Sequence, residues 1–205
     1  MIKTLLVFFH LIATCAAIGT IVITDLRLAA KALGYKVVIP PPERFETFVI
    51  SMALGALYIT GAGIVWLGLQ ADPAYLDNPK LQAKLVLVLV LTLNAFVLHR
   101  LVFPILGRSR TVSRWSTRDW TVVAASVSLS NSIWFFSAFL GVARVWNGTV
   151  PLGFVLAVAL AGWAVTFMLV NGLLMLASRD EPKGRPDWID SMKASLSDFA
   201  DLRKE

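Results

Sequence analysis

The stretch from Val150 to Ala177 decides the fold class, because it reads VPLGFVLAVALAGWAVTFMLVNGLLMLA and contains no charged residue. A transmembrane helix needs about 20 mostly apolar residues, and this stretch exceeds that length. Unpaired backbone groups cannot lie in hydrocarbon, so an open strand is excluded. The sequence therefore predicts a transmembrane helix from about Val150 to Ala177.

Four more stretches meet the same criterion. They run from about Thr4 to Thr24, from about Phe45 to Leu69, from near Leu81 or Leu85 to about Leu106, and from about Trp120 to Val142. We therefore expect an all-α integral membrane bundle of five transmembrane helices over residues 1–178. A cytoplasmic tail, residues 179–205, is expected to follow it.

The composition agrees with this class. The chain has 205 residues, of which 57% are hydrophobic and 16% charged, and its mean hydropathy is +0.72. Soluble domains carry about 45–50% apolar and about 25% charged residues, and disordered segments carry fewer apolar ones. The single cysteine excludes a disulfide framework and a cysteine-rich metal site. The sequence offers no nucleophile–base pair and no glycine-rich phosphate loop, which disfavours hydrolases and ATP-driven pumps.

The first stretch has a second interpretation as a signal peptide, because Lys3 precedes an apolar run. That run continues almost unbroken to Ile23, whereas the apolar core of a signal peptide spans about 7–15 residues. We therefore expect a retained transmembrane helix.

Lysine and arginine are distributed unequally between the two sides of the predicted bundle. On the side of the N-terminus lie Lys3, Lys80, Lys84 and Arg144, and all the remaining members of the 19 Lys and Arg residues lie on the other side. The positive-inside rule then places the N-terminus outside and the C-terminus in the cytoplasm. The membrane we expect is the inner membrane of a bacterium. The net charge of +6 is accordingly explained by anionic lipid rather than by nucleic acid.

The tail changes character after Ala177. Pro186 and Asp187 are typical of a helix start, and the apolar residues that follow fall on one face at helical spacing. These are Trp188, Ile189, Met192, Leu196, Phe199 and Leu202. The pattern predicts an amphipathic helix that lies on the inner membrane surface or docks on a partner protein.

Three ionisable residues inside the predicted helices are candidates for function, because such residues are costly in a bilayer. His10 lies between apolar neighbours, Lys84 begins the third helix, and His99 lies near its other end beside Arg100. Lys84 and Arg100 also fit interfacial anchors whose charged ends reach the headgroups. His10 is harder to explain in that way, and haem, a metal or a proton relay are the usual reasons for such a residue.

The other polar residues of the spans fit bonds between helices better than a ligand role. They are Asn94, Asn131, Asn171, Ser126, Ser128, Ser130, Ser132 and Ser137.

The positions of the two histidines disfavour a haem held by both. His10 is about 10 Å along the first helix from its start, whereas His99 is about 22 Å beyond Lys84 along the third. His10 is expected to share the outer half with Lys84. His99 is expected to share the inner half with Met52 and Met168, and methionine pairs with histidine at haem and copper sites.

The first 110 residues also resemble a known superfamily. The first helix carries His10, then Gly19, then the turn Asp25-Leu26-Arg27-Leu28, and the third helix opens with Lys84-Leu85-Val86-Leu87-Val88-Leu89. This arrangement resembles the small bacterial membrane proteins that include HemJ-type protoporphyrinogen oxidases and CopD-type copper-resistance proteins. The family turn contains Pro-Arg-Leu, from which this chain departs.

The resemblance implies haem b, with His10 and Lys84 as the matching positions and His99 as a further match. The first hypothesis is therefore a membrane oxidoreductase or haem-handling protein that passes electrons to quinone or a membrane partner, as a monomer or a homo-oligomer. The second is a copper or small-solute transport protein that uses His10, Cys15, His99 and methionines such as Met168. The third is a structural subunit of a membrane complex.

Overall fold

The computed structural model describes residues 1–32, 44–108 and 112–179, and 93% of these are helical, with no strand among them. Within these ranges, five helices are long and apolar enough to cross a membrane, which confirms the predicted all-α bundle. The predicted amphipathic helix and most of the tail lie outside the described residues.

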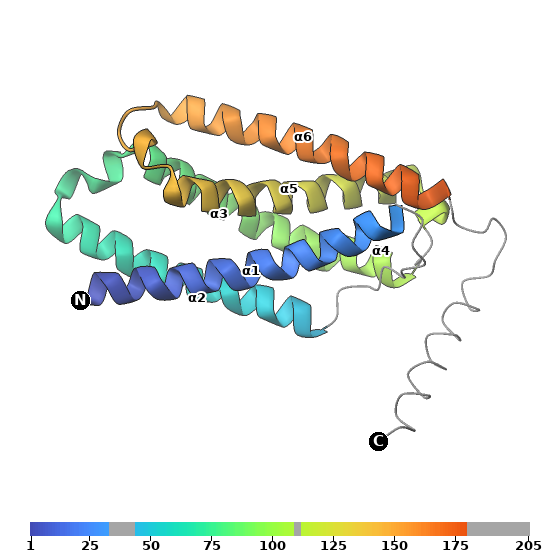
Figure 1. Ribbon diagram of the computed structural model, residues 1–205, viewed down its shortest axis with the longest axis horizontal. Coiled ribbons are helices and arrows are strands. Elements are labelled where there is room, and N and C mark those ends of the chain that lie inside the picture. The colour runs from blue at the N-terminus through green and yellow to red at the C-terminus, as the bar shows by residue number, and fades with distance from the viewer. Residues whose placement is uncertain (33–43, 109–111, 180–205) are drawn as a thin grey trace, which may run out of the picture.

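The five spans are formed by the following helices. They are α1 (Ile2–Ala32), α2 (Arg44–Ala71), α3 (Pro79–Val97) with its continuation, α5 (Thr117–Val142) and α6 (Leu152–Arg179). Short helices lie between them: η1 (Pro73–Asp77), η3 (Val112–Arg114) and η4 (Arg144–Trp146). The N-terminus and the end of α6 lie at opposite ends of the bundle (Figure 1).

The third span contains a local change of helix type. After α3 the chain forms one π-helical segment, η2 (Leu98–Val102), and then α4 (Phe103–Arg108). The amide of Phe103 donates to the carbonyl of Leu98, five residues back. Pro104 follows, has no amide proton and cannot continue the regular bonding, which is the usual cause of such an irregularity. The sequence indicated one uniform helix here, so the π segment is a finding of the structure.

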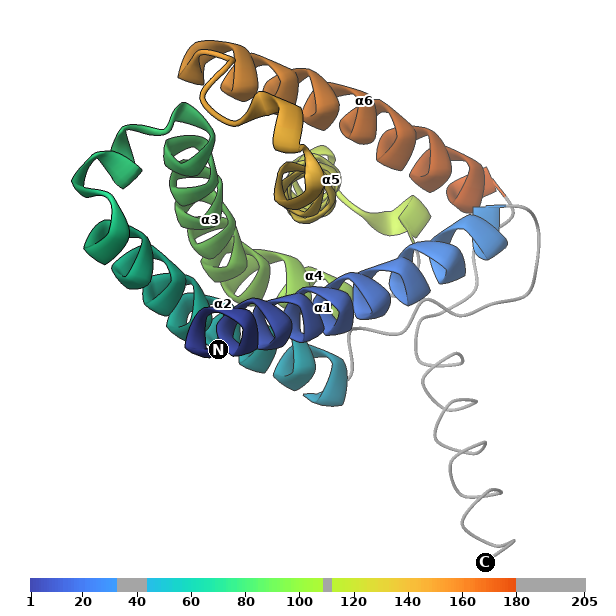
Figure 2. The ribbon, with the colours of Figure 1, turned by 60° about the vertical axis from the view of Figure 1, so that its left-hand side comes forward.

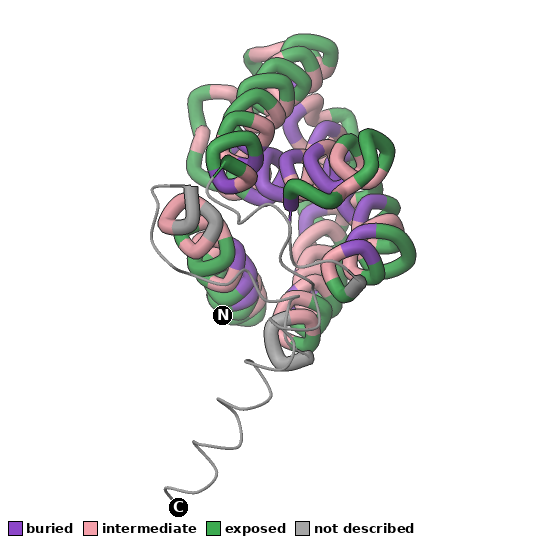
Figure 3. Tube along the Cα trace, turned by 90° about the vertical axis from the view of Figure 1, so that its right-hand side faces the viewer, coloured by how far each residue is buried: buried purple, intermediate pink, exposed green. Residues whose placement is uncertain are grey.

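Helix α5 occupies the centre of the bundle. It packs against α3 and α6, while α1 pairs with α2 and also contacts α6 and α5. Figure 2 shows α5 nearly end-on, with the other helices around it, and Figure 3 shows much of the buried surface there. Neither α1 nor α2 packs its backbone closely on α3. The bundle therefore consists of an α1–α2 hairpin laid against a tighter group of α3, α5 and α6.

The turns on the side of the N-terminus are joined by polar bonds. Lys80 is buried, and its Nζ donates to the carbonyl of Ala143, at the end of α5, over 2.8 Å. Asn78 Nδ2 donates to Asn147 Oδ1 over 2.7 Å. A cation beside helix C-terminal carbonyls is favourable, because these carbonyls carry partial negative charge. Lys80 thus links the start of α3 to the end of α5.

The first helix is longer than the predicted span. The apolar stretch ends near Thr24, but α1 continues to Ala32, so that Asp25 is inside a helix rather than at its end. Hydropathy measures where apolar residues stop, whereas a helix continues as long as its backbone bonds and its neighbours support it. This difference matters for the site described below.

Candidate functional site

His10 is held by the neighbouring helix. It lies in the first half of α1, is half-buried, and its Nδ1 is 2.8 Å from the hydroxyl of Thr60 in α2. Thr60 is buried. Gly61 follows it, and a Cβ placed there would lie 3.6 Å from the His10 ring, in ordinary contact. The close pairing of α1 and α2 therefore fixes the imidazole against α2.

The partners of Thr60 bear on which nitrogen of His10 carries the proton. The Thr60 hydroxyl donates its single proton to the carbonyl of Ala56 over 2.6 Å. With the proton on this bond, the Thr60 oxygen accepts and Nδ1 of His10 donates, whereas a proton directed at His10 would reverse the roles. In the first arrangement the neutral imidazole keeps a lone pair on Nε2. A second partner that orients a histidine and fixes its tautomer in this way is typical of metal-binding histidines.

Lys84 of α3 lies close enough to interact electrostatically with His10. It is half-buried, and it also interacts with Lys80 on the same helix. Among the described residues, no carboxylate bonds to its ammonium group. The structure therefore brings together His10 and Lys84, two of the residues singled out by the sequence, from helices that are not closely packed on each other.

His99 is far from this pair. It lies in the π segment η2 and is exposed, and its Nδ1 is bonded to the carbonyl of Ala95 over 2.8 Å. Its ring meets Phe103 edge-on at 4.8 Å. Fifteen residues separate it from Lys84, or about 22 Å along a helix. His99 therefore lies at the other end of the third span from Lys84, which disfavours one iron held by both histidines.

The remaining candidate ligands are not gathered into a metal site. Met168 is 71% exposed on α6, Met52 is 59% exposed on α2, and Cys15 is exposed on α1. In the described part of the chain, no group of three or more His, Cys, Asp or Glu side chains could hold a metal ion. A copper site built from these residues alone has no structural support there.

Four of the eight polar residues, Asn94, Asn131, Asn171 and Ser128, join helices through their side chains, whereas the hydroxyl of Ser137 is buried without a partner among the described residues. Asn94 donates to the carbonyl of Ser126 over 2.8 Å, and both are buried. Trp163 donates to the hydroxyl of Ser128 over 3.2 Å, and Trp120 donates to Asn171 over 2.9 Å. These bonds connect α5 with α3 and α6. Such bonds hold helices together where lipid is as apolar as the side chains.

One pair combines a charge with such a bond and was missed by the sequence analysis. Nδ2 of Asn131 in α5 lies 2.8 and 3.0 Å from the two carboxylate oxygens of Asp25 in α1. Asn131 is buried and Asp25 half-buried. Asp25 was interpreted as part of a turn, because the predicted first span ended at Thr24. Thr60 was also missed, since nothing in the sequence pairs it with His10.

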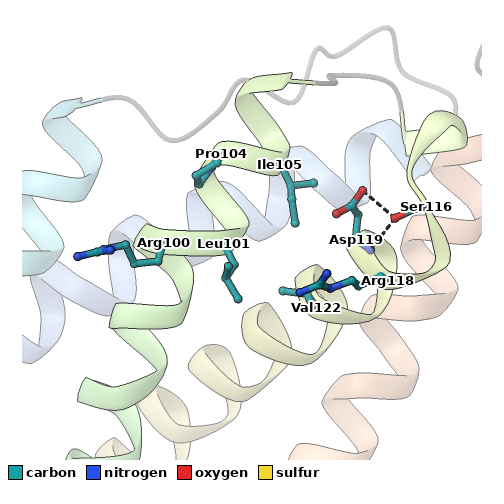
Figure 4. A pocket seen from close by; sticks show the side chains of 8 residues that line it. All are labelled: Arg100, Leu101, Pro104, Ile105, Ser116, Arg118, Asp119 and Val122. Carbon is teal, nitrogen blue, oxygen red and sulfur yellow. Dashed lines mark hydrogen bonds between the residues drawn. The ribbon is translucent and has the colours of Figure 1, made fainter.

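The described part of the structure has two cavities near polar residues. One, of about 450 Å³, is lined by Asp25 and Asn131 together with aromatic side chains of α5. The other, of about 330 Å³, lies between α4 and the start of α5, and it has Arg100 and Arg118 in its lining. Figure 4 shows the second cavity, where Ser116 bonds to Asp119 as the cap of α5. Neither lining includes His10, Lys84 or His99.

Comparisons with known proteins give no identity. No family model, no curated protein and no solved structure matches the chain.

Proposed function

We propose that this protein binds haem b in the membrane, with His10 as an axial ligand through Nε2, and acts as a redox or haem-handling protein. The observation that carries the proposal is the pair of bonds at Thr60. The Thr60 hydroxyl lies 2.6 Å from the Ala56 carbonyl and 2.8 Å from Nδ1 of His10, and with its proton on the carbonyl the Nε2 of His10 keeps its lone pair. This is the protonation state that an iron ligand requires.

Lys84 supports the same proposal. Its ammonium group is half-buried near His10, and it has no carboxylate partner among the described residues. A haem carries two propionates, and a lysine that lacks a counter-anion is suited to bind one of them. His99 does not take part at this site, because it lies about 22 Å further along the third span.

His10 and Lys84 would approach a ligand from two different helices. The two residues come from helices that are not closely packed on each other, whereas α1 and α2 are closely paired. His10 would hold the ring from α1, Thr60 would keep the imidazole in one orientation, and Lys84 would fix the rim from α3.

The bound haem would supply a one-electron couple whose potential depends on its axial ligand and on the polarity nearby. A membrane quinone or a membrane redox partner fits the apolar exterior of the bundle. The distribution of the basic residues supports a site in the outer half of a bacterial inner membrane, with the N-terminus outside. A homo-oligomer is compatible with this arrangement.

The test is an absorption spectrum of the full chain, purified in mild detergent with haem supplied during expression. We expect a Soret band and a reduced-minus-oxidised difference spectrum. His10→Ala should lose both, and Lys84→Met should retain less haem. Thr60→Val should bind haem about 10- to 100-fold more weakly, as expected when a partner that orients a metal ligand is removed.

His99→Ala is the matched control, because it removes an imidazole from the other end of the third span. It should leave the spectrum unchanged. A colourless protein, or a haem band that survives His10→Ala, contradicts the proposal. A colourless preparation that binds copper would instead favour the copper-handling hypothesis, and one that copurifies with other subunits would favour the structural one.

A further inference from the structure

The cavity beside Asp25 lies apart from the proposed haem site and has a chemistry of its own. It measures about 450 Å³ and is bounded by α1, α5 and α6. Asp25 comes from α1, the aromatic residues from α5, and Gly162 and Thr166 from α6. Pockets for small molecules fall in this range of size and combine apolar walls with a few polar groups.

The polar end of the cavity is a carboxylate with a neutral partner. Asn131 Nδ2 approaches both oxygens of Asp25, at 2.8 and 3.0 Å. Among the described residues, no Lys, Arg or His side chain bonds to Asp25. A carboxylate has about four acceptor positions, and the Asn131 amide group fills at most two of them. An acidic group inside a transmembrane helix calls for a partner, and a cation is the one that matches its charge.

The walls of the cavity also favour a cation. Phe135, Phe136 and Phe139 line it, and the rings of Phe136 and Phe139 stack with their centroids 6.0 Å apart. Trp146, which is not in the lining, packs edge-on against Phe139 at 5.3 Å. Aromatic faces attract cations, and they do so more strongly where water is excluded. Carboxylate and aromatic rings together are a recognition surface for an organic cation rather than for an anion or a metal ion.

The mouth of the cavity lies on the outside of the bundle. Phe135 is 44% exposed and Phe139 is 45% exposed, and both lie within the span of α5. The surface of a spanning helix faces hydrocarbon. A ligand that reaches Asp25 by this route must therefore have an apolar body as well as a positive charge.

We infer that this cavity binds a lipophilic organic cation, with its charge at Asp25 and its apolar body against the phenylalanines of α5. The inference is independent of haem, since neither His10 nor Lys84 lines the cavity. It assigns the Asp25–Asn131 pair to ligand binding in addition to joining α1 and α5.

The probe is radiolabelled tetraphenylphosphonium, measured by equilibrium binding to the full chain in nanodiscs of zwitterionic phosphatidylcholine. Empty nanodiscs give the partition into lipid, which is subtracted. Tetraphenylborate has nearly the same size and shape but the opposite charge. We expect saturable binding of the cation at one site per chain, and no saturable binding of the anion.

Two variants separate charge from shape. Asp25→Asn keeps the bond to Asn131 available and removes the charge, so it should weaken binding of the cation at least tenfold. Gly162→Ile leaves Asp25 intact and fills the cavity, because a Cβ at this glycine faces the Ser132 hydroxyl at 3.5 Å. It should weaken binding by a similar factor.

Each variant has a matched control. Asp119→Asn removes a carboxylate at the start of α5, and Gly172→Ile adds a side chain to α6 where a Cβ meets nothing within 4 Å. Both should bind the cation within twofold of the original chain. If Asp25→Asn does not fold, Gly162→Ile still decides the question.

The inference is overturned if the original chain shows no saturable binding of the cation, if tetraphenylborate binds as tightly, or if folded Asp25→Asn or Gly162→Ile binds like the original. Failure of the haem proposal would not produce these results. The haem spectrum of Asp25→Asn should match that of the original chain, which keeps the two proposals separable.

Discussion

In soluble proteins the most apolar helix is usually the most buried one. Helices α5 and α2 show the opposite relation. The most apolar window of α2 has a mean hydropathy of 2.0, and 11% of it is buried. The corresponding window of α5 is the least apolar of the five, at 1.5, yet 39% of it is buried. Lipid solvates apolar side chains as well as protein does, so the more polar helix takes the centre, where Ser128 and Asn131 bond to neighbouring helices.

The largest expected effect comes from overfilling the centre. Ser128 of α5 is fully buried and accepts a bond from Trp163. Ser128→Leu adds volume where none is free and removes that acceptor, so it should destabilise the fold by about 3 kcal/mol. The measurement is thermal unfolding in detergent. Ala157→Leu, on the exposed face of α6, should change the midpoint little. If Ser128→Leu and Ala157→Leu lowered the unfolding midpoint equally, the contrast between the buried centre and the lipid-facing surface would be wrong.

The second prediction concerns the close contact between Gly68, near the C-terminal end of α2, and Tyr75. A Cβ at Gly68 would collide with the ring of Tyr75 in η1. Gly68→Ala should therefore cost about 1–3 kcal/mol, because the ring has to move. The same substitution at Gly55 meets nothing within 4 Å and should be neutral or slightly stabilising. The measurement is the unfolding midpoint of each variant. If Gly55→Ala lost as much stability as Gly68→Ala, the predicted clash with Tyr75 would be wrong.

A smaller effect is expected from one bond between helices. Asn94→Leu keeps the approximate volume and removes the bond to the carbonyl of Ser126, so a loss of about 0.6 kcal/mol is expected, with about 1.7 as the upper bound. Denaturation of the purified protein measures it. Because Asn94 is 5% exposed, a stabilising result would show that this polar contact is not needed to place α3 on α5.

The smallest effect concerns the lipid-facing surface. Met168 is 71% exposed on α6, although the sequence proposed it as a metal ligand. Met168→Leu should alter neither the unfolding midpoint nor copper binding, because the two side chains have similar volume and lipid solvates both. A drop in copper binding would restore Met168 as a ligand.

The candidate sites show where sequence reasoning succeeds and where it stops. His10 and Lys84 stand out because ionisable groups are rare in apolar stretches, and the structure places them near each other. Thr60 does not stand out, because threonines are common in spans and only the pairing of α1 with α2 joins it to His10. Asp25 was lost when the span was ended by hydropathy, although α1 continues beyond it.

The sequence by itself determined five helices of spanning length, because apolar length and backbone bonding in hydrocarbon leave no other structure. Tertiary structure alone decided which helix lies in the centre, that His10 faces Thr60, and that Asp25 meets Asn131 across 106 positions of the chain. The physical reason is that lipid-facing and protein-facing positions are both apolar, so the pattern along the chain does not distinguish them. Only the packing of the helices reveals which polar groups meet.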